Sequence, residues 1–335
     1  MAVSTRKPKT EPETPAAPVA VEIPPFVVTD VRHPTRYCRW CGEHFMPVWP
    51  VWMDEDTKKD QWLCPTVACH TRQLHYAMKH ATEPRYIYIP TPAGVELLEA
   101  KTRHVLWGGS AGAAKSHGLR WEMYHWMQRI PDFRGLLMRR TYPELESTHL
   151  SAMQAEEGLL PGFRYVAGQR MMVNDENGAF CRAGHCDSPK DYNKLLSTEY
   201  DRITLDEGVT FMERQITEIS GRRRTSNPLV KRLMGGAGVR IGTNPGGEGH
   251  DYLHSAYIKH DLDPFDYPKY NPALYQFIPA FLRDNPYADD EYEETLEQQH
   301  KDRAKQLLDG DWNAYMGSFL PMFNQSHIVT DMANV

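Results

Sequence analysis

This sequence has no surplus of positive charge, no long apolar run, and no apolar core near its N-terminus. Its 38 lysines and arginines stand against 44 aspartates and glutamates, a net charge of −6, so any contact with nucleic acid has to come from a local basic patch. No apolar run approaches the length that crosses a membrane, and the N-terminal segment lacks the hydrophobic core of a signal peptide. These absences predict a protein of the reducing cytosol.

Cysteine is scarce as well, with six residues in the whole chain, and in a reducing setting this favours metal binding or free thiols over disulfides. Four of them follow the spacing C-x2-C-x22-C-x4-C, namely Cys38, Cys41, Cys64 and Cys69. Paired thiolates, with Gly42 relieving the turn, suit a closed and therefore structural Zn²⁺ site, for which His70 is an alternative fourth ligand. The alternative is a small apolar cluster of buried thiols. Cys181 and Cys186 lie apart, and we expect them to be free.

The most informative segment is Gly108–Ser116, with the sequence GGSAGAAKS. The apolar run Val105–Trp107 precedes it. A stretch of helical period follows, and one of its faces carries Leu119, Met123, Trp126 and Ile130. A strand, a loop of small residues, Lys-Ser and a helix form the layout of a phosphate-binding loop, in which backbone N–H groups and the helix N-terminus face the phosphates. An ordinary glycine-rich turn is the alternative.

Within this loop, Lys115 can reach the outer phosphates of a nucleotide and the Ser116 hydroxyl can bind Mg²⁺. The other residues expected around the phosphates are Gly109, Ser110, Ala111, Gly112, Ala113 and Ala114. The usual pattern has glycine just before the lysine. Alanine at position 114 is tolerated if that residue is already helical, so we expect a negative φ there.

A second apolar run, Arg202–Leu205, ends in two adjacent carboxylates. At the end of a strand, Asp206 can hold the Mg²⁺ shell, and Glu207 can orient and deprotonate an attacking water. A strand that merely ends in acidic turn residues is the alternative. Together with the phosphate-binding loop, the pair predicts ATP hydrolysis.

A further strand, Val239–Gly242, runs into Thr243 and Asn244. Polar residues at the carboxyl end of a strand lie beside the ligand in an open α/β sheet, so Asn244 can contact the γ-phosphate. A simple Asn-Pro-Gly turn explains the same residues.

Three other elements are predicted from pattern. Met171–Val173 and Ala179–Cys181 flank an Asn-Gly turn and predict a β-hairpin. A short helix is expected over Val95–Lys101. A charged surface helix is expected over Asp289–Leu308, with Gly310 as its stop.

In this order, the segments resemble the large, or motor, subunits of tailed-phage terminases. The matching pieces span about residues 86–323 and are PTP before the short helix, VLWGGSAGAAKS, LLMRRTYPEL, the Asn-Gly hairpin, YDRITLDE, IGTNPGG-x-GH, FIPAFLRDNP and LLDGDW. The resemblance implies a RecA-like P-loop ATPase with a mainly parallel sheet flanked by helices. Here a small zinc-ribbon-like segment precedes it.

The resemblance also implies a task, which is to pump double-stranded DNA into a procapsid in the cytoplasm of an infected bacterial host. Its cofactors would be ATP and Mg²⁺, and its partners DNA, the portal protein and the small terminase subunit, with the chain in a ring-shaped homo-oligomer on the portal. Thr243 and Asn244 would form the coupling motif, and Arg139 or Arg140 would stabilise charge in hydrolysis. Arg222–Arg224 are further arginine candidates. Gly94 stands where many members have a glutamine that contacts adenine.

We therefore divide the chain into a disordered tail over 1–27, a zinc-binding segment over 28–82, the ATPase domain over 86–323, and a tail or the start of a linker over 324–335. Terminases usually continue into an RNase H-like nuclease domain, but after Trp312 only Asp331 is acidic. We expect no DNA cleavage by this chain alone, and a truncated chain or one half of a split gene, with the nuclease domain separately encoded. Two alternatives are another P-loop DNA helicase or repair ATPase, and a non-catalytic zinc-containing adaptor with a degenerate loop.

Overall fold

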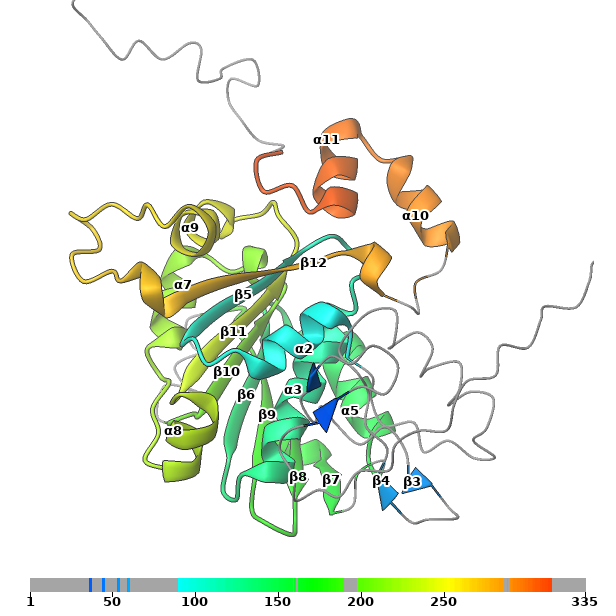
Figure 1. The fold of residues 1–335 in the computed structure, drawn as a ribbon, viewed down its shortest axis with the longest axis vertical. Coiled ribbons are helices and arrows are strands. Elements are labelled where there is room, and N and C mark those ends of the chain that lie inside the picture. Colours follow the sequence, from blue (N-terminus) through cyan, green and yellow to red (C-terminus); the bar gives the residue numbers. More distant parts are fainter. Residues whose placement is uncertain are drawn as a thin grey trace, which may run out of the picture.

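The computed structural model describes residues 90–158, 160, 162–188, 198–285, 288 and 290–314, together with four two-residue strands nearer the N-terminus (Figure 1). Those short strands form two antiparallel pairs, which are β1 (Arg36–Tyr37) with β2 (His44–Phe45) and β3 (Met53–Asp54) with β4 (Lys59–Asp60). The four cysteines of the predicted zinc site lie outside the described residues, so Zn²⁺ binding there stays a prediction.

An eight-stranded sheet forms the centre of the described part, in the order β12-β5-β11-β10-β6-β9-β8-β7. The first six strands in this order are parallel, and β7 and β8 add an antiparallel edge. The strands are β5 His104–Gly109, β6 Arg134–Arg139, β7 Phe163–Val166, β8 Met171–Asn174, β9 Phe180–His185, β10 Arg202–Asp206, β11 Gly238–Thr243 and β12 Tyr275–Ala280. This mainly parallel sheet, flanked by helices, confirms the predicted fold class for the described residues.

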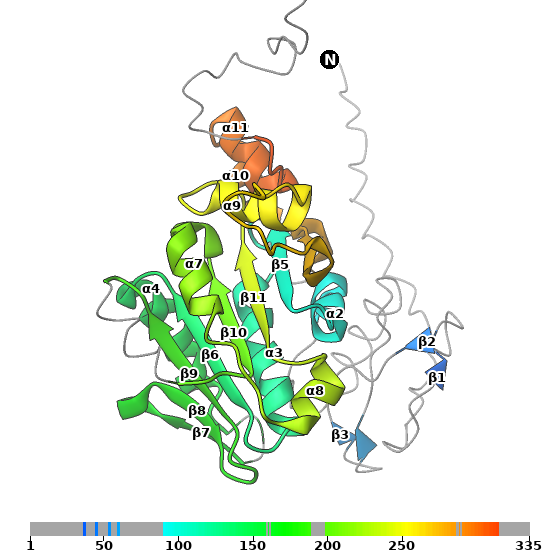
Figure 2. The same cartoon turned by 90° about the vertical axis from the view of Figure 1, so that its left-hand side faces the viewer.

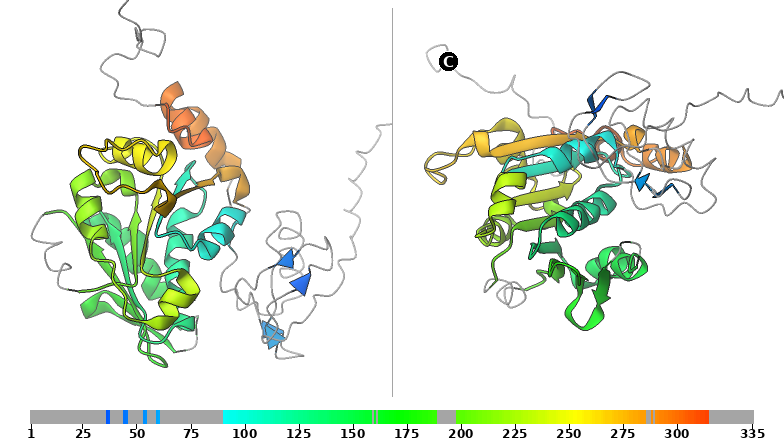
Figure 3. Two further views of the ribbon diagram at one scale, coloured as in Figure 1. Left: turned by 60° about the vertical axis from the view of Figure 1, so that its left-hand side comes forward. Right: turned by 60° about the horizontal axis from the view of Figure 1, so that its bottom comes forward.

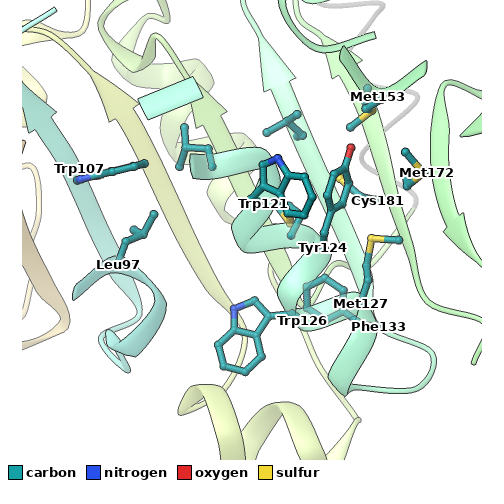
Figure 4. Close-up of a cluster of buried hydrophobic side chains, with 14 of the residues drawn as sticks. Leu97, Trp107, Trp121, Tyr124, Trp126, Met127, Phe133, Met153, Met172 and Cys181 are labelled. Carbon is teal, nitrogen blue, oxygen red and sulfur yellow. The ribbon is translucent and has the colours of Figure 1, made fainter. Parts of the chain in front are cut away.

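One face of the sheet is covered by α2 (Pro92–Glu99), α3 (Lys115–Arg129) and α8 (Pro228–Met234). Strand side chains alternate between the two faces, so Val105 and Trp107 of β5 point into this layer. Figure 4 shows the core here, where aromatic and sulfur-containing side chains of α3 meet the strands, among them Trp121, Tyr124, Trp126 and Met127. The helical face predicted after the loop is therefore buried.

The opposite face is covered by α7 (Glu213–Ser220) and α9 (His250–His254). The alternate strand residues, such as Leu106, Ile203 and Ile241, pack there. Because both faces are buried, the strands carry apolar residues at nearly every position rather than at every second one, as expected of a parallel sheet. Within the described part, no helix combines the length and the apolar character needed to cross a bilayer.

The remaining α-helices are short: α4 Tyr142–Leu145, α5 Ser151–Ala155, α10 Asp290–Glu297 and α11 Lys301–Ala304. Turns of 3-10 helix lie at Ala167–Gln169, Gly208–Thr210, Pro272–Leu274 and Leu282–Asp284. Turns of π-helix lie at Glu146–Leu150, Ser255–Lys259 and Lys305–Asp309. In Figure 2 the parallel strands run toward the end of the sheet where α10 and α11 lie, and the left view of Figure 3 shows the same two helices, in orange, beyond that end.

The local predictions were correct in type and partly wrong in extent. The hairpin is present, with Gly178 at φ 75 in its turn, and Cys181 and Cys186 are buried thiols that form no disulfide, as expected. The short helix α2 begins three residues early because Pro92 opens it and the Thr91 hydroxyl accepts a hydrogen bond from the amide of Gly94.

The prediction of a single charged helix over Asp289–Leu308 was wrong. The segment forms two helices, α10 and α11, because His300 takes an extended ψ of 138° and its side chain caps the amide of Asp302. The predicted stop is correct, since Gly310 ends the second helix with φ 63.

Acid is expected to destabilise the fold partly through His104, which lies on β5 and stacks on Tyr275 with ring centroids 4.5 Å apart. Burial and three nearby arginines lower the pKa of His104 from 6.5 to about 3. As pH falls below 6.5, His104 binds a proton in the unfolded chain but not in the folded chain, so the free energy of unfolding decreases. Between pH 6.5 and about 5 the loss is about 2 kcal/mol.

Replacing this histidine should remove that pH dependence. His104→Phe should lose about 2 kcal/mol less than the natural chain over the same range, as measured by urea unfolding at several pH values. His260→Asn, at an exposed position, is the control for replacing a histidine. Equal slopes for all three proteins would exclude His104 as a proton-linked group.

Candidate functional site

The carboxyl ends of β5, β11 and β10 bring the predicted site residues to one edge of the sheet. In the register of these strands Asp206 lies opposite Gly242, and Thr243 lies opposite Gly108. Parallel strands end together, so residues more than a hundred positions apart become neighbours there. Arg139, at the end of β6, lies at the same edge.

Lys115 occupies the centre of the small-residue loop and is only 7% exposed. Its Nζ donates to the carbonyl of Ser110 at 2.6 Å and to Oδ1 of Asn244 at 2.6 Å. Burial lowers the pKa of Lys115 to about 8, although the charges of Glu207 and Asp206 oppose the shift. A desolvated ammonium is therefore held between the loop and the end of β11.

Asp206 is 1% exposed, and two cationic or polar partners hold its Oδ2. Arg139 donates to it at 2.7 and 2.8 Å, and His149 Nε2 lies 2.8 Å away. Burial alone would raise the pKa of the Asp206 carboxyl. The hydrogen bond from His149 and the charge of Arg139 outweigh burial and hold the pKa well below its usual value. Asp206 is thus a permanent anion at the floor of the site.

Arg139 also donates to the Ser116 hydroxyl at 3.3 Å, so its guanidinium spans Ser116 and Asp206. A positive charge therefore lies where oxygen atoms from the loop and from β10 converge. A hydroxyl and a carboxylate are oxygen ligands of the kind that Mg²⁺ takes when it also binds nucleotide phosphates. The two residues predicted to share Mg²⁺ fit that group. No cluster of three or more metal-binding side chains occurs among the described residues.

Glu207 follows Asp206 with φ 54, in the left-handed region. Burial and the adjacent Asp206 charge raise the pKa of Glu207, against the attraction of Arg139 and Lys115. The turn after it is tied to the end of β11, because the amide of Val209 donates to the Thr243 hydroxyl at 3.2 Å. The turn that follows the acidic pair is therefore hydrogen-bonded to the end of β11.

The prediction of a negative φ at Ala114 was wrong. Ala114 has φ 58 and ψ 24 and lies just before the first residue of α3. The loop has to turn sharply for its amides to face inward before the helix begins, and that turn requires the left-handed conformation that glycine adopts at no cost. Alanine there stores strain of roughly 1–2 kcal/mol.

Ala114→Gly is expected to stabilise the protein by about 0.5–1 kcal/mol, because it relieves this strain by more than it adds freedom to the unfolded chain. Thermal or urea unfolding measures the difference. The neighbouring substitution Ala113→Gly is the matched control, since Ala113 has no positive φ, and it should destabilise by a similar amount. A destabilised Ala114→Gly protein would show that the turn is not strained.

The other arginine candidates lie elsewhere in this chain. Arg140 donates to the carbonyl of Cys186 rather than to Asp206. Arg224 donates its backbone amide to Tyr200, which lies before β10, so Arg222–Arg224 are at the opposite end of the strands. Of the five arginines, the structure brings only Arg139 into the cluster.

Two features of the site were missed in the sequence. His149 carries no motif, and its contact with Asp206 spans 57 positions. The C-terminal segment also closes over the loop: the amide of Ala111 donates to Leu307 at 2.7 Å, and Asn285 donates to the carbonyl of Gly112 at 2.6 Å. Gly310 lies so close to Gly109 that a Cβ would be 2.5 Å from its Cα. Gly310 is thus a contact residue as well as a helix stop.

Comparison with known proteins supports the fold. No protein-family profile matches the sequence, and no curated protein does. The large terminase of a thermophilic bacteriophage superposes with a TM-score of 0.53 at 12% identity, over 71% of this chain and 57% of that one. The fold is that of a large terminase. Another crystal form of the same phage terminase, in complex with ADP, gives 0.50 at 13% identity, over 66% and 53% of the two chains.

The match covers little more than half of the length of that phage terminase. In this fold the small-residue loop follows β5 and the acidic pair lies at the end of β10, in a mainly parallel sheet as the resemblance implied.

Proposed function

We propose that this chain is the ATP-hydrolysing motor of a tailed-phage terminase, which moves double-stranded DNA into a procapsid. One observation carries the proposal: residues from four separate segments form two hydrogen-bonded pairs, Lys115 with Asn244 and Arg139 with Asp206, at the carboxyl edge of a terminase-fold sheet, and Arg139 also donates to Ser116, the residue after Lys115. A decayed phosphate-binding loop would have no reason to keep a buried lysine, which costs free energy by desolvation.

In this proposal the loop residues from Gly109 to Ala114 turn their amides toward the phosphates of ATP, and the N-terminus of α3 adds its partial positive charge. Lys115 supplies a point charge to the outer phosphates. Asn244, which already accepts from Lys115, lies where it can respond to the γ-phosphate.

Ser116 and Asp206 would hold Mg²⁺, which neutralises charge on the phosphate oxygens when bound. Glu207 would orient and deprotonate the attacking water. Its raised pKa makes it a stronger base than an exposed glutamate, and the nearby cations Arg139 and Lys115 oppose that rise.

Arg139 is the arginine that we assign to charge stabilisation, because its guanidinium already lies between Ser116 and Asp206. Arg139→Ala should lower the turnover number about 10- to 100-fold, the value of one hydrogen bond to a charged group. Arg140→Ala is the matched control, since Arg140 bonds a backbone carbonyl outside the cluster, and its turnover should stay within about threefold. Steady-state ATPase assays measure both. Equal losses would contradict the assignment.

Hydrolysis would be coupled to movement through the contacts of the loop. Thr243 binds the turn after Glu207, Asn244 binds Lys115, and Leu307 binds Ala111. A change at the phosphates can therefore reach both the end of β11 and the C-terminal segment. The DNA, the portal protein, the small terminase subunit and a ring of copies of this chain are the partners that we propose on the terminase fold.

The test has two stages with purified protein. Hydrolysis of ATP by the natural chain, absent in Lys115→Ala, distinguishes an enzyme from an adaptor. Displacement of a third strand from duplex DNA, without separation of the duplex strands, then distinguishes a packaging motor from a helicase. We expect ATP-dependent displacement in the presence of the portal. Strand separation would favour the helicase instead.

A further inference from the structure

A line of polar side chains leads from Asp206 through the buried His149 and Arg120 to the partly buried Glu156. His149 Nε2 lies 2.8 Å from Asp206 Oδ2, and Arg120 Nη1 lies 3.4 Å from His149 Nδ1. Arg120 is in turn held by Glu156 through two bonds of 2.7 Å. The Tyr124 hydroxyl also donates to Glu156, at 2.9 Å. His149 is fully buried, and Arg120 is 5% exposed.

The partners of His149 determine which ring nitrogen carries the proton. An arginine can only donate, so Nδ1 of His149 has to accept from Arg120. Nε2 then carries the hydrogen and donates to the Asp206 carboxylate. The order Glu156, Arg120, His149, Asp206 therefore sets both the tautomer and the orientation of the ring.

The backbone around His149 is also unusual. Between α4 and α5 the helix widens into a π-helical turn over Glu146–Leu150, in which the amide of Ser151 bonds to the carbonyl of Glu146. Such turns insert one extra residue into a helix and redirect a side chain, and they are common at functional sites. A buried arginine and histidine with a partly buried glutamate seldom stabilise a fold more than apolar residues of the same size would. Stability alone does not account for this arrangement.

Two donors hold the same oxygen of Asp206, and they differ in their surroundings. Arg139 approaches from the loop side, is 12% exposed and also bonds Ser116, so a divalent cation at those oxygens would compete with it. His149 approaches from the interior and has no exposed surface. A cation that binds Ser116 and Asp206 would therefore displace Arg139, which contacts both, sooner than His149, which contacts only Asp206 of the two.

We infer that His149 is a positioning residue that fixes the orientation of the Asp206 carboxylate for the nucleotide-bound divalent cation, and that Arg120 and Glu156 hold His149 in the required tautomer. The inference rests on the proposed function, since it presupposes that Asp206 serves the cation. Residues of this kind, which orient a metal ligand without touching the metal, change metal affinity or activity about 10- to 100-fold when removed.

The experiment compares His149→Gln with His149→Asn. The amide nitrogen of glutamine can take the place of Nε2 and donate to Asp206, whereas that of asparagine takes the place of Nδ1 and falls short of it. We expect His149→Gln to keep ATPase turnover and half-saturating Mg²⁺ within about threefold of the natural chain. In His149→Asn the half-saturating Mg²⁺ concentration should rise about 10- to 100-fold. The same two substitutions at His125, a buried histidine of α3 that packs against Trp126, are the control for replacing a buried histidine elsewhere in the fold.

Failure of the inference and failure of the proposed function give different results. No Mg²⁺-dependent hydrolysis by the natural chain would remove the proposed function and the inference with it. An active natural chain with equal Mg²⁺ dependence in both His149 variants would overturn the inference alone. A second measurement needs no variant: ¹H–¹⁵N NMR of the natural chain should show His149 protonated on Nε2 and not on Nδ1. The opposite tautomer would overturn the inference.

Discussion

Glu207→Gln is expected to slow ATP hydrolysis by roughly 10²–10⁴-fold while ATP still binds, the loss typical of a general base. The substitution keeps the size of the side chain and removes only its charge and basicity. It also removes an anion whose pKa is raised by burial and by the adjacent Asp206, so the folded state should gain slightly in stability rather than lose it.

Single-turnover hydrolysis and equilibrium binding of a fluorescent ATP analogue measure the two properties separately. Glu248→Gln is the matched control, because Glu248 is exposed and lies beyond the cluster, and it should behave like the natural chain. Tight binding together with turnover near that of the natural chain would place the base elsewhere than Glu207.

Lys115→Ala is expected to abolish ATP turnover and weaken nucleotide binding, through loss of the charge on the outer phosphates. Two contacts disappear with it, those to the Ser110 carbonyl and to Asn244. The loop would then lose both its cation and its link to the end of β11.

For stability, removing the charge of Lys115 is expected to have the opposite effect, a gain rather than a loss. Burial lowers the pKa of Lys115 from 10.5 to about 8, which corresponds to about 3 kcal/mol of unfavourable desolvation at neutral pH. Lys115→Met, which keeps the volume without the charge, should therefore be inactive yet at least as stable as the natural chain in urea unfolding. An active variant would remove the phosphate-binding assignment, and a strongly destabilised one would show that the lysine is structural.

The elements of the site could be predicted from the sequence because each depends on neighbours along the chain. A strand that is apolar at nearly every position, a loop of small residues and a helix of regular period are local patterns, and all three occur where GGSAGAAKS places them. The same holds for β10 and its acidic end, and for the Asn-Gly hairpin. Their order along the chain was enough to predict a terminase-like parallel sheet.

Local pattern was insufficient where a conformation depends on what surrounds it. The φ of Ala114 follows from the closure of the whole loop, so a rule about alanine alone predicted the wrong sign. The helix expected over Asp289–Leu308 breaks at His300, whose side chain accepts a hydrogen bond from the backbone amide of Asp302. Charge periodicity carries no information about such a cap.

The sequence by itself thus determined which residue types lie at the end of each strand, and so the chemistry available to this protein. Only the tertiary structure decided which of them meet. Arg139 rather than Arg140 reaches Asp206, and His149 approaches the same oxygen from behind. The reason is physical: contacts across 57 or 67 positions depend on strand register and on one widened helical turn, and neither leaves a periodic signal in the chain.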